Sequence, residues 1–581
     1  MLRARPPPLQ LAIYGCLIAA IALLVSQMLG TGFTCDDDMF TATARLRWGG
    51  VWKASWTMAT GHGRFYHLLV YPLAQLPYLW PGFAIPTAFR ILSTATVFVA
   101  FYFAVRSLFG SAALAAFFSV IVAGLLTTTH MFNPVHALPL WFNFGMTVLL
   151  VAVLFFSEGL TSGSMARIRW SGAFFFLSSL FYETFVTYLL LFPIIALVKK
   201  AGSGQGIRQQ VASALRISTP IFVAFGVWLA LFLTFRKLFP PDYPGSKLVL
   251  GAPLEMLAPV LQFSRSGLNL DAAWRVDWTL DRSAVAAALA GAAGLYLSLQ
   301  VLRRTLPGHS LAAIAIVGIL FALMPNVIFG LTPRYREWVR YDLYYLGSFY
   351  AAFSLACVVG AGLLAVHGLA RGQLAARLLA GALAGLFGVA TYANHLESSR
   401  FFGIHRANRE QWTLLDEAVA HGLLRDLGPR AVLVAPQLMR MPLLSPYAYD
   451  YWSYYLTGAL GRPLQVVETP RDQSQLPPAT RQTLPSLDSN PELWGLALHF
   501  SSATHAGIVG IARIDASAWR SNEAVLPTRS AHVYIEPESA RPGRLIAHAR
   551  QDQVLSLPLA AGMDVRSLST FDLKTLSFTD E

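Results

Sequence analysis

Long apolar stretches recur along the chain up to about residue 396, and short polar segments separate them. The first covers residues 11–30, and most of the others approach the roughly 20 residues that an α-helix needs to cross a bilayer. This pattern predicts a polytopic α-helical membrane protein. Further spans are expected at 86–109, 111–129, 136–157, 217–238, 281–302, 311–330, 344–366 and 378–395.

Residues 171–198 are also apolar, but they have basic residues on both sides. Basic loops are enriched on the cytoplasmic side of membrane proteins, so both flanks are expected on that side, whereas a single crossing would separate them. The stretch is therefore predicted to form a hairpin of two short helices, about 14 residues each, with Glu183 at its apex. The flanking basic residues are Arg167, Arg169, Lys199 and Lys200.

The basic loops also predict how the chain is oriented. With the hairpin counted as two helices, roughly eleven helices result, and the basic amino end falls in the cytoplasm. The first apolar run exceeds the roughly 7 to 15 residues of a signal-peptide core, so it is expected to remain as the first helix. We expect an integral protein of a bacterial-type inner (plasma) membrane, with a cytoplasmic N-terminus and an extracytoplasmic C-terminal domain.

Residues 397–581 differ in pattern from the preceding chain. Short alternating runs such as AVLVAP, LQVVE, AGIVGIARI, AHVYIEP and RLIAHA are separated by Pro, Gly and Ser, which is typical of strands. The run RANREQWTLLDEAVAHGLL near the start is typical of a helix. We therefore expect a transmembrane domain at residues 1–396 and a mixed α/β domain at residues 397–581.

Composition supports this assignment and argues against a nucleic-acid-binding protein. Of the 581 residues, 55% are hydrophobic and 13% are charged, which is too apolar for a soluble protein of several domains. The net charge is +13, but residues 397–581 contain 17 Lys plus Arg against 19 Asp plus Glu, leaving 27 against 12 in residues 1–396. Basic residues in the membrane part indicate topology, so no nucleic acid is expected as a partner.

Three consecutive carboxylates, Asp36, Asp37 and Asp38, follow the first apolar stretch directly. Adjacent acids repel one another and lose hydration near lipid, which raises at least one pKa toward the range of a general base. The alternative is that these acids only end the helix at the water boundary.

Tryptophans and a GHGR motif follow the acidic triplet. Trp48, Trp52 and Trp56 recur every four residues, so a helix lying on the membrane surface would carry them on one face. The alternative is two short pieces, because Gly49 and Gly50 interrupt the pattern. Two roles are open for these indoles, interfacial anchoring and sugar stacking, and aromatic belts favour the first. In GHGRFYHLLVYP, Arg64 and His67 would return toward the membrane near the triplet.

The loop LTPRYREWVRYD is basic although it falls on the side where basic residues are normally depleted. Its arginines, Arg334, Arg336 and Arg340, suit a lipid-linked phosphate, because guanidinium groups offer paired donors that match phosphate oxygens. The alternative is local pairing with Glu337 and Asp342 in a solvated loop.

Other aromatic and histidine residues fall on the same predicted side. His130 and His136, in THMFNPVHALP, lie six residues apart without a helical register, which is more typical of structural histidines than of metal ligands. No metal ligand is assigned. Trp274 and Trp278 are four residues apart and are interpreted as a second interfacial anchor.

Together these features resemble the GT-C superfamily, whose members are integral membrane glycosyltransferases, over about the first 396 residues. The shared features are acids after the first helix, a surface helix, a GR-containing segment, a short hairpin with a polar apex and an outward RY loop. The chain is similar to the protein O-mannosyltransferases and aminoarabinose transferases of this superfamily, which use sugars linked to polyprenyl phosphate. The resemblance implies a GT-C-like fold and a catalytic base at Asp36, Asp37 or Asp38.

The resemblance also implies a mechanism, an inverting single displacement. The carboxylate takes a proton from an acceptor hydroxyl while that oxygen attacks the anomeric carbon, and Glu183 orients the acceptor or assists the base. Basic side chains stabilise the departing lipid phosphate. The donor-phosphate site is assigned to Arg64, Arg334, Tyr335 and Arg336. The further site candidates are His67, His130 and Arg340.

The expected partners are a polyprenyl-phosphate sugar donor, a glycan, lipid or protein acceptor, and membrane lipids. No cofactor is expected, with a divalent metal left open. The alternative from another class is an ion-coupled transporter or a flippase for lipid-linked saccharides. Transporters place ionisable residues near the bilayer midplane, where the long apolar stretches here lack acids. A scaffold whose outer domain binds envelope polysaccharide is a third option, although an anchor needs fewer helices.

Overall fold

The structure of the protein is a computed structural model. It describes residues 8–31, 47–80, 82–129, 133, 135–200, 206–247, 249, 253–302, 308–339, 345–420, 424, 427–428, 431–435, 448–467, 492–501, 506–514, 527–535, 547–550, 571–572 and 577–578. The chain divides into two compact units. Unit 1 comprises Met1–Leu29, Trp52–Pro77 and Ala84–Phe402, and unit 2 comprises Gly30–Val51, Tyr78–Phe83 and Gly403–Glu581.

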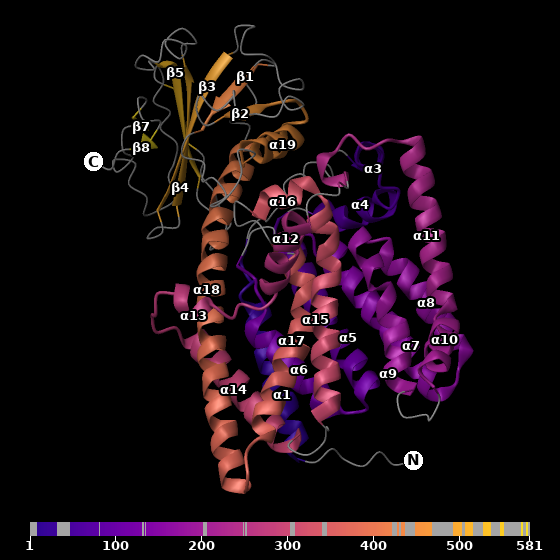
Figure 1. Ribbon diagram of the computed structural model, residues 1–581. Coiled ribbons are helices and arrows are strands. Elements are labelled where there is room, and N and C mark those ends of the chain that lie inside the picture. The colour runs from indigo at the N-terminus through magenta and orange to yellow at the C-terminus, as the bar shows by residue number, and fades with distance from the viewer. Residues whose placement is uncertain are drawn as a thin grey trace. The chain divides into compact units, whose positions relative to one another are not determined.

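Unit 1 is built mainly from apolar helices (Figure 1). Among the described residues, eight helices are long and apolar enough to cross a membrane, and the shorter α6 (Ala112–Leu125) is apolar throughout. The prediction of a polytopic α-helical protein is therefore confirmed, and α6 with the two arms of a hairpin brings the helices to the eleven expected from the sequence. The eight are α1 (Pro8–Ser26), α5 (Ala84–Phe109), η2 (Leu140–Phe144) with α7 (Gly145–Ser162), α11 (Thr219–Leu238), α14 (Arg282–Leu302), α15 (Gly308–Leu331), α17 (Tyr345–Gly368) and α18 (Gln373–Ala420).

Shorter helices connect these spans. The tryptophan-rich segment forms one helix, α3, which continues through Gly49 and Gly50. Trp52 and Trp56 of α3 are exposed, while Val51 is buried. Trp52 and Trp56 therefore lie on one exposed face of α3, as predicted. The connecting helices are α3 (Arg47–His62), α4 (His67–Gln75), η1 (Leu76–Leu79), α10 (Ile207–Ile217), η4 (Pro244–Ser246), α12 (Pro253–Arg265), α13 (Ala272–Arg275) and α16 (Pro333–Val339).

Small residues let the spans pack closely. At Gly318 of α15, an added Cβ would lie 2.7 Å from the Val358 side chain and 2.9 Å from the Ser354 carbonyl oxygen of α17. Close backbone approach of this kind is typical of helix pairs in membranes, where association depends on van der Waals packing.

The predicted hairpin is present. Helix α8 (Met165–Ser179) is followed by a turn, the 3-10 helix η3 (Glu183–Leu190) and α9 (Leu191–Lys200). The rings of Phe175 and Phe192 pack edge to face with centroids 5.4 Å apart, so the two arms lie side by side. At the other end, Lys199 Nζ donates to Thr161 Oγ1 at 2.9 Å, beside the turn into α8. Glu183 is therefore at the apex, as predicted.

The two arms differ in length, unlike the equal arms expected from the sequence. Helix α8 has 15 residues and rises about 22 Å at 1.5 Å per residue. The second arm contains 8 residues of 3-10 helix before the 10 residues of α9. Because a 3-10 helix rises about 2.0 Å per residue, this arm reaches about 31 Å.

The span expected at 136–157 begins differently from a regular helix. A π-helix, η2, precedes α7, and Leu138 just before it has a φ of 50°. The left-handed region is sterically costly for a branched side chain, so surrounding contacts must hold this residue in place. The Leu138 carbonyl accepts hydrogen bonds from the backbone N–H groups of Trp141 and Phe142, at 3.0 and 3.3 Å.

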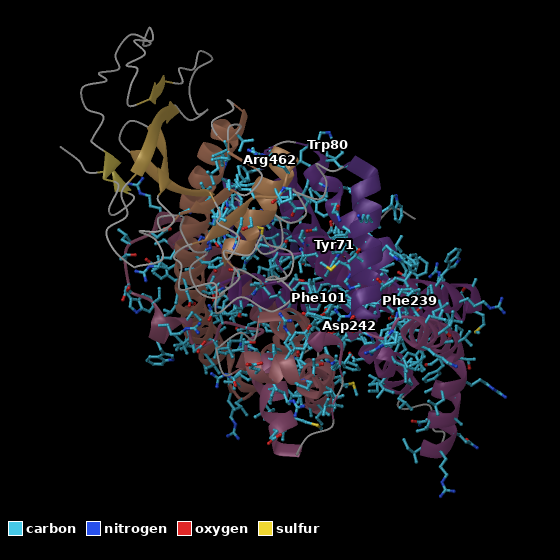
Figure 2. The ribbon with its side chains drawn as sticks, turned by 90° about the horizontal axis from the view of Figure 1, so that it is seen from above. Tyr71, Trp80, Phe101, Phe239, Asp242 and Arg462 are labelled. Atoms are coloured by element: carbon cyan, nitrogen blue, oxygen red, sulfur yellow. The ribbon has the colours of Figure 1, made fainter. Side chains whose placement is uncertain are left out.

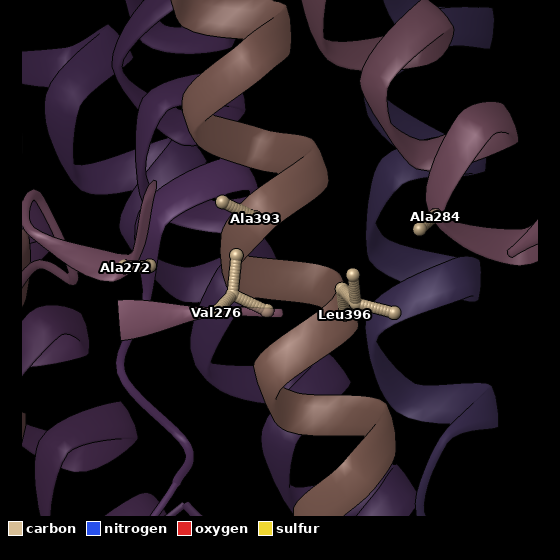
Figure 3. Packing of buried hydrophobic residues seen from close by; sticks show 5 residues of the cluster. All are labelled: Ala272, Val276, Ala284, Ala393 and Leu396. Carbon is tan, nitrogen blue, oxygen red and sulfur yellow. The ribbon is translucent and has the colours of Figure 1, made fainter. Parts of the chain in front are cut away.

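Helix α18 extends for 48 residues without a break through the expected domain boundary at 396/397. The span expected at 378–395 and the helix expected near residue 406 are one element. On its unit 1 portion, Ala393 and Leu396 pack against α13 and α14 (Figure 3). The full cluster consists of Ala272, Val276, Ala284, Ala393 and Leu396.

Unit 2 contains a mixed six-stranded sheet in the order β2-β1-β3-β4-β5-β6. Strand β1 pairs in parallel with β2 and β3, and the remaining pairs are antiparallel. Together with α19, this confirms the expected mixed α/β character, although β3 was missing from the predicted runs. The elements are β1 (Ala431–Val434), α19 (Ala448–Leu460), β2 (Gln465–Val467), β3 (Glu492–Ser501), β4 (Ala506–Ile514), β5 (Pro527–Ile535), β6 (Ala547–Arg550), β7 (Phe571–Asp572) and β8 (Ser577–Phe578).

Candidate functional site

The GHGR motif forms a tight turn between α3 and α4. Gly63 has a φ of 63°, in the left-handed region that favours glycine. A Cβ at this position would lie 3.2 Å from Pro241 and 3.3 Å from Arg236, so the segment after α11 also leaves no room for a side chain. This turn directs Arg64 into unit 1, where its side chain is only 5% exposed.

Arg64 forms a buried ion pair with Glu183 at the hairpin apex. The Glu183 side chain is 14% exposed, and its second carboxylate oxygen accepts a hydrogen bond from the Tyr66 hydroxyl. Arg64 also donates to the Gly245 carbonyl at 3.5 Å. A charged pair removed from water is tolerated when its geometry is good and the remaining donors and acceptors are used, as they are here.

Two tyrosines connect the hairpin apex to the RY motif. The hydroxyls of Tyr182 and Tyr335 lie 3.2 Å apart, and both rings are buried. The Arg64 guanidinium lies 5.5 Å from the centre of the Tyr182 ring, within range of a cation–π interaction. The start of α16 therefore lies beside the Arg64–Glu183 pair.

The segment after α11 contributes a third aromatic residue. The backbone N–H groups of Asp242 and Tyr243 both donate to the Gly61 carbonyl, at 3.0 and 3.3 Å. Tyr243 stacks on His62, with ring centroids 4.2 Å apart, and the Arg334 guanidinium lies 4.8 Å from the Tyr243 ring centre. Phe239 and Asp242 mark this segment in Figure 2.

We call these eight residues the Arg64 cluster. They come from four segments that are distant in sequence and that meet within unit 1. The members are His62, Arg64, Tyr66, Tyr182, Glu183, Tyr243, Arg334 and Tyr335.

Two histidines, His62 in the cluster and His67 beside it, are held neutral. Burial, followed by the charges of Arg64 and Arg334, lowers the pKa of His62 to about 3. Burial also lowers the pKa of His67 well below its ordinary value, and Arg64 and His62 contribute. His67 is 2% exposed, and neither of its ring nitrogens has a hydrogen-bond partner among the described residues. Both imidazoles are therefore neutral at pH 7.

The π-helix η2 supplies the aromatic wall behind these residues. The Trp141 ring packs edge to face on His67, with centroids 5.3 Å apart. The Phe142 ring lies 5.2 Å from that of Tyr182. Two consecutive side chains, those of Trp141 and Phe142, thus contact His67 and Tyr182. The irregular start of this span therefore lines the site.

Arg336 points away from the cluster toward α12. It pairs with Glu255 at 3.7 Å and donates to the Val249 carbonyl at 3.3 Å. This pairing differs from the alternative considered from the sequence, in which Glu337 and Asp342 were the partners. The Arg336 side chain is 17% exposed, so it borders the site without being enclosed by it.

The structure brings together five of the predicted site residues and leaves others outside the part of the chain that it describes. Arg64, Glu183, Arg334 and Tyr335 belong to the cluster, and His67 adjoins it. The predicted residues outside the described part are Asp36, Asp37, Asp38, His130 and Arg340.

Four residues of the cluster escaped the sequence analysis: His62, Tyr66, Tyr182 and Tyr243. For the first two a signal existed, because they flank Arg64 within the GHGRFY motif. Tyr182 precedes the predicted apex residue directly. Tyr243 carried no signal, since its role depends on a backbone pairing with Gly61 that the sequence does not reveal.

No metal centre is seen in the part of the chain that the structure describes: no group of three or more His, Cys, Asp or Glu side chains is close enough to hold an ion there. His136 is buried, and one of its ring nitrogens lies 3.1 Å from the Thr128 carbonyl oxygen.

Comparison with known proteins gives a distant likeness. No family model matches the chain, and no curated protein matches it. Among solved structures, the chain is similar to the crystal structure of ArnT from Cupriavidus metallidurans bound to undecaprenyl phosphate. The similarity covers 83% of this chain and 92% of that one, with 13% sequence identity and a TM-score of 0.39.

Proposed function

We propose that the protein is a membrane glycosyltransferase that transfers a sugar from a polyprenyl-phosphate-linked donor to an acceptor hydroxyl. The single observation that supports this most is the convergence of the GHGR, hairpin-apex and RY segments on one buried cluster. The sequence predicted these segments separately as parts of one site. Within this cluster the Arg334 guanidinium lies over the Tyr243 ring, and the Tyr335 hydroxyl lies beside that of Tyr182 at the hairpin apex.

The proposed reaction is a single displacement. One carboxylate of Asp36, Asp37 or Asp38 accepts the proton of the acceptor hydroxyl while its oxygen forms a bond to the anomeric carbon. The bond between the anomeric carbon and the phosphate oxygen breaks, and the electron pair leaves with the lipid phosphate. Arg334 and Arg336 stabilise that growing negative charge, since preorganised cations act most strongly where water is excluded.

Arg64 and Glu183 have a positioning role in this scheme. Because Arg64 is buried against Glu183, the pair fixes the hairpin apex and thereby the Tyr182–Tyr335 contact. Arg64 remains buried behind the donor phosphate because it is paired with Glu183. Its positive charge attracts the phosphate without direct contact. Because His62 and His67 are neutral, the positive charge of the site comes from the arginines.

The proposed partners follow from this chemistry. The donor is a sugar on a polyprenyl phosphate, and the acceptor is a glycan, lipid or protein carrying a free hydroxyl. We place the site and unit 2 on the extracytoplasmic face of a bacterial-type inner membrane, with the N-terminus in the cytoplasm. The ArnT crystal structure contains undecaprenyl phosphate, a ligand of the proposed class.

An ion-coupled transporter or flippase has less support. In the eight apolar spans that the structure describes, the acidic residues are Glu158 and Glu397, and each lies near an end of its span, which for Glu397 is Gln373–Gly403. A coupling site at the bilayer midplane would need ionisable residues at the centre of the spans.

The test begins with mass spectrometry of envelope glycans, glycolipids and glycoproteins from cells with and without the protein. A sugar that is lost names the donor and the acceptor together. Complementation with Asp36→Asn, Asp37→Asn and Asp38→Asn then tests the base. Since general base catalysis contributes about a hundred- to ten-thousand-fold, one variant should lose transfer almost completely.

The matched control is Asp277→Asn, the same change at an exposed residue that pairs with Arg400 outside the cluster. It should transfer normally. Full transfer by the triple Asn variant, at normal abundance, would contradict the assignment of the triplet as the base. Unchanged glycans in cells lacking the protein, with accumulation of a lipid-linked saccharide on one leaflet, would support the flippase instead.

A further inference from the structure

Helix α10 is strongly amphipathic but turns only a narrow face toward the protein. It packs against α9 and α11, and Ala214 is its buried residue. Gln210, Ser213 and Ile217 are partly buried beside it. At about 100° per residue, these four positions lie on one side of the helix.

A second face of α10 is apolar and exposed. Ile207 is 70% exposed, Val211 37% and Leu215 46%, and their spacing of four residues aligns them in a stripe. This stripe is centred about 110° away from the protein-facing side, as follows from 100° per residue. In a soluble protein, such a row of exposed aliphatic side chains is unfavourable unless another surface covers it.

The third face is polar and carries positive charge. Arg208, Gln209, Ala212 and Arg216 are all exposed and lie on the side remaining between the other two faces. The helix therefore has three separate environments around its axis: protein, apolar surroundings and water. A helix lying in the plane of a membrane interface beside a helical bundle has this distribution.

The neighbouring elements indicate that lipid is the apolar surface. Helix α11 follows α10 after Ser218 and is long and apolar enough to cross a membrane. It exposes Val223, Val227 and Leu231. The α10 stripe is thus adjacent in the chain to a helix whose exposed apolar side chains also need lipid.

Charge at this end of the bundle indicates which headgroups are present. Arg167 and Arg169, at the start of α8, are exposed, and so is Trp170. They lie at the same end as α10, because Lys199 of α9 bonds to Thr161 just before α8. Basic residues and an exposed indole near helix ends are typical of contact with anionic headgroups.

We propose that α10 lies in the interface of the bilayer, with Ile207, Val211 and Leu215 among the acyl chains and Arg208 and Arg216 on anionic phosphate headgroups. At 11 residues, about 16 Å, the helix is too short to cross the membrane itself. This binding surface is independent of the proposed glycosyltransferase site, which lies at the other end of the hairpin.

Spin labels test the position of the stripe in the full chain. Cys16, Cys35 and Cys357 are replaced by Ser, and single cysteines are introduced by Val211→Cys or Ala212→Cys in nanodiscs containing phosphatidylglycerol. We expect the label at 211 to collide mainly with oxygen, which concentrates in the bilayer, and the label at 212 to collide mainly with a water-soluble nickel chelate. The two positions are adjacent, so they are matched except for the face of the helix.

Hydrogen exchange tests the headgroups. In nanodiscs of phosphatidylglycerol and phosphatidylcholine, exchange of residues 207–217 should be slower than in phosphatidylcholine alone. The expected difference is about five-fold for each arginine that contacts the anionic surface, and it should shrink at high salt. An Arg208→Gln/Arg216→Gln variant should lose the difference between the lipids.

Each of these measurements also has an outcome that would overturn the proposal. Equal nickel accessibility at 211 and 212 would show that water covers both faces and would overturn the proposal. An immobile label at 211, inaccessible to both reagents, would indicate a protein partner and would also overturn it. Equal exchange in the two lipids would overturn the anionic headgroup assignment. Val211→Asn should raise exchange of the helix, whereas Ala212→Asn should leave it unchanged.

Discussion

Arg64 and Glu183 are 119 residues apart in the sequence, and they form a buried ion pair where the turn after α3 meets the hairpin apex. This pair joins two motifs that the sequence showed only separately.

Glu183→Gln is expected to destabilise the protein. The substitution leaves the Arg64 guanidinium buried without its countercharge, and breaking a buried pair in this way typically costs about 3–5 kcal/mol. Denaturation of the purified protein in detergent would measure the loss. The matched control is Glu158→Gln, because Glu158 pairs with Arg167 at 3.1 Å with both side chains almost half exposed. An exposed pair contributes about 1 kcal/mol or less. Equal effects of the two variants would show that the buried pair does not hold the hairpin.

Gly63→Ala is expected to be destabilising and Gly61→Ala harmless. An alanine at 63 would be held in the left-handed region, at a cost of about 1–2 kcal/mol, and its Cβ would also press on Pro241. Gly61 is the last glycine of α3, and a Cβ there meets nothing within 4 Å. Alanine at 61 should therefore be neutral or stabilising by up to about 1 kcal/mol. Thermal unfolding midpoints of the two variants give the comparison, and a stable Gly63→Ala protein would contradict the described turn.

Stability is expected to fall as the pH drops below about 6.5, the ordinary pKa of histidine. Burial lowers the pKa of His67, so below that pH the unfolded chain binds a proton that the folded chain does not. The contribution is complete above the unfolded pKa and is lost toward the folded one, at about 1.4 kcal/mol per pH unit for a full proton. His67→Gln, which cannot titrate, should show a shallower decline in unfolding midpoint between pH 6.5 and 4.5. An unchanged slope would mean that His67 is not held neutral.

Arg334→Lys is expected to weaken donor binding by about ten-fold or more. Lysine keeps the charge but loses the planar fork that matches phosphate and that lies over the Tyr243 ring. Arg336→Lys should have a smaller effect, since Arg336 is directed toward Glu255. Binding of undecaprenyl phosphate to the purified protein is the measurement, with Arg400→Lys as a control outside the cluster. Normal binding by both Arg334→Lys and Arg336→Lys would refute the phosphate assignment.

The proposed orientation predicts where cysteines can be labelled in intact cells. A cysteine introduced at Ser521 should react with a membrane-impermeant reagent, and one at Arg303 should react only after the membrane is opened. The basic loops require this arrangement if they are cytoplasmic. The reverse labelling pattern would invert the topology and remove the site from the outer face.

Much of the fold was predictable because the membrane imposes simple rules. Apolar length identified the spans, and the basic flanks of residues 171–198 identified the hairpin and its apex. The unequal arms were not predictable, since no residue in ETFVTYLL prevents a regular α-helix. The 3-10 geometry there depends on tertiary contacts such as the bond from the Tyr188 hydroxyl to the Tyr350 carbonyl.

The boundary at 396/397 shows a limit of hydropathy as a guide. Hydropathy falls after residue 396, and that fall predicted an end to the span, yet α18 continues to Ala420. A polar sequence can extend a helix as well as an apolar one, because helix propensity and hydropathy are separate properties. The end of an apolar stretch indicates where lipid contact ends rather than where the helix ends.

The candidate site was predictable in its charged residues and not in their partners. Glu183 was predicted from the basic flanks that put it at the hairpin apex, and Arg64 from the GHGR segment that follows the acidic triplet. Their pairing depends on contacts across 119 residues, which a single sequence does not show. From the sequence alone, Glu183→Gln would be expected to leave the fold intact, and only the buried guanidinium reverses that expectation.

The order of biosynthesis gives the ion pair a further consequence. Ribosomes make Arg64 before Glu183, so the guanidinium already exists when the hairpin carrying the carboxylate is inserted. A buried charge without a partner is costly, and pairing with Arg64 would relieve that cost as the hairpin packs. Loss of Arg64 would therefore appear first as retention of the nascent hairpin by the insertion machinery and as proteolysis, before any defect in turnover could be measured.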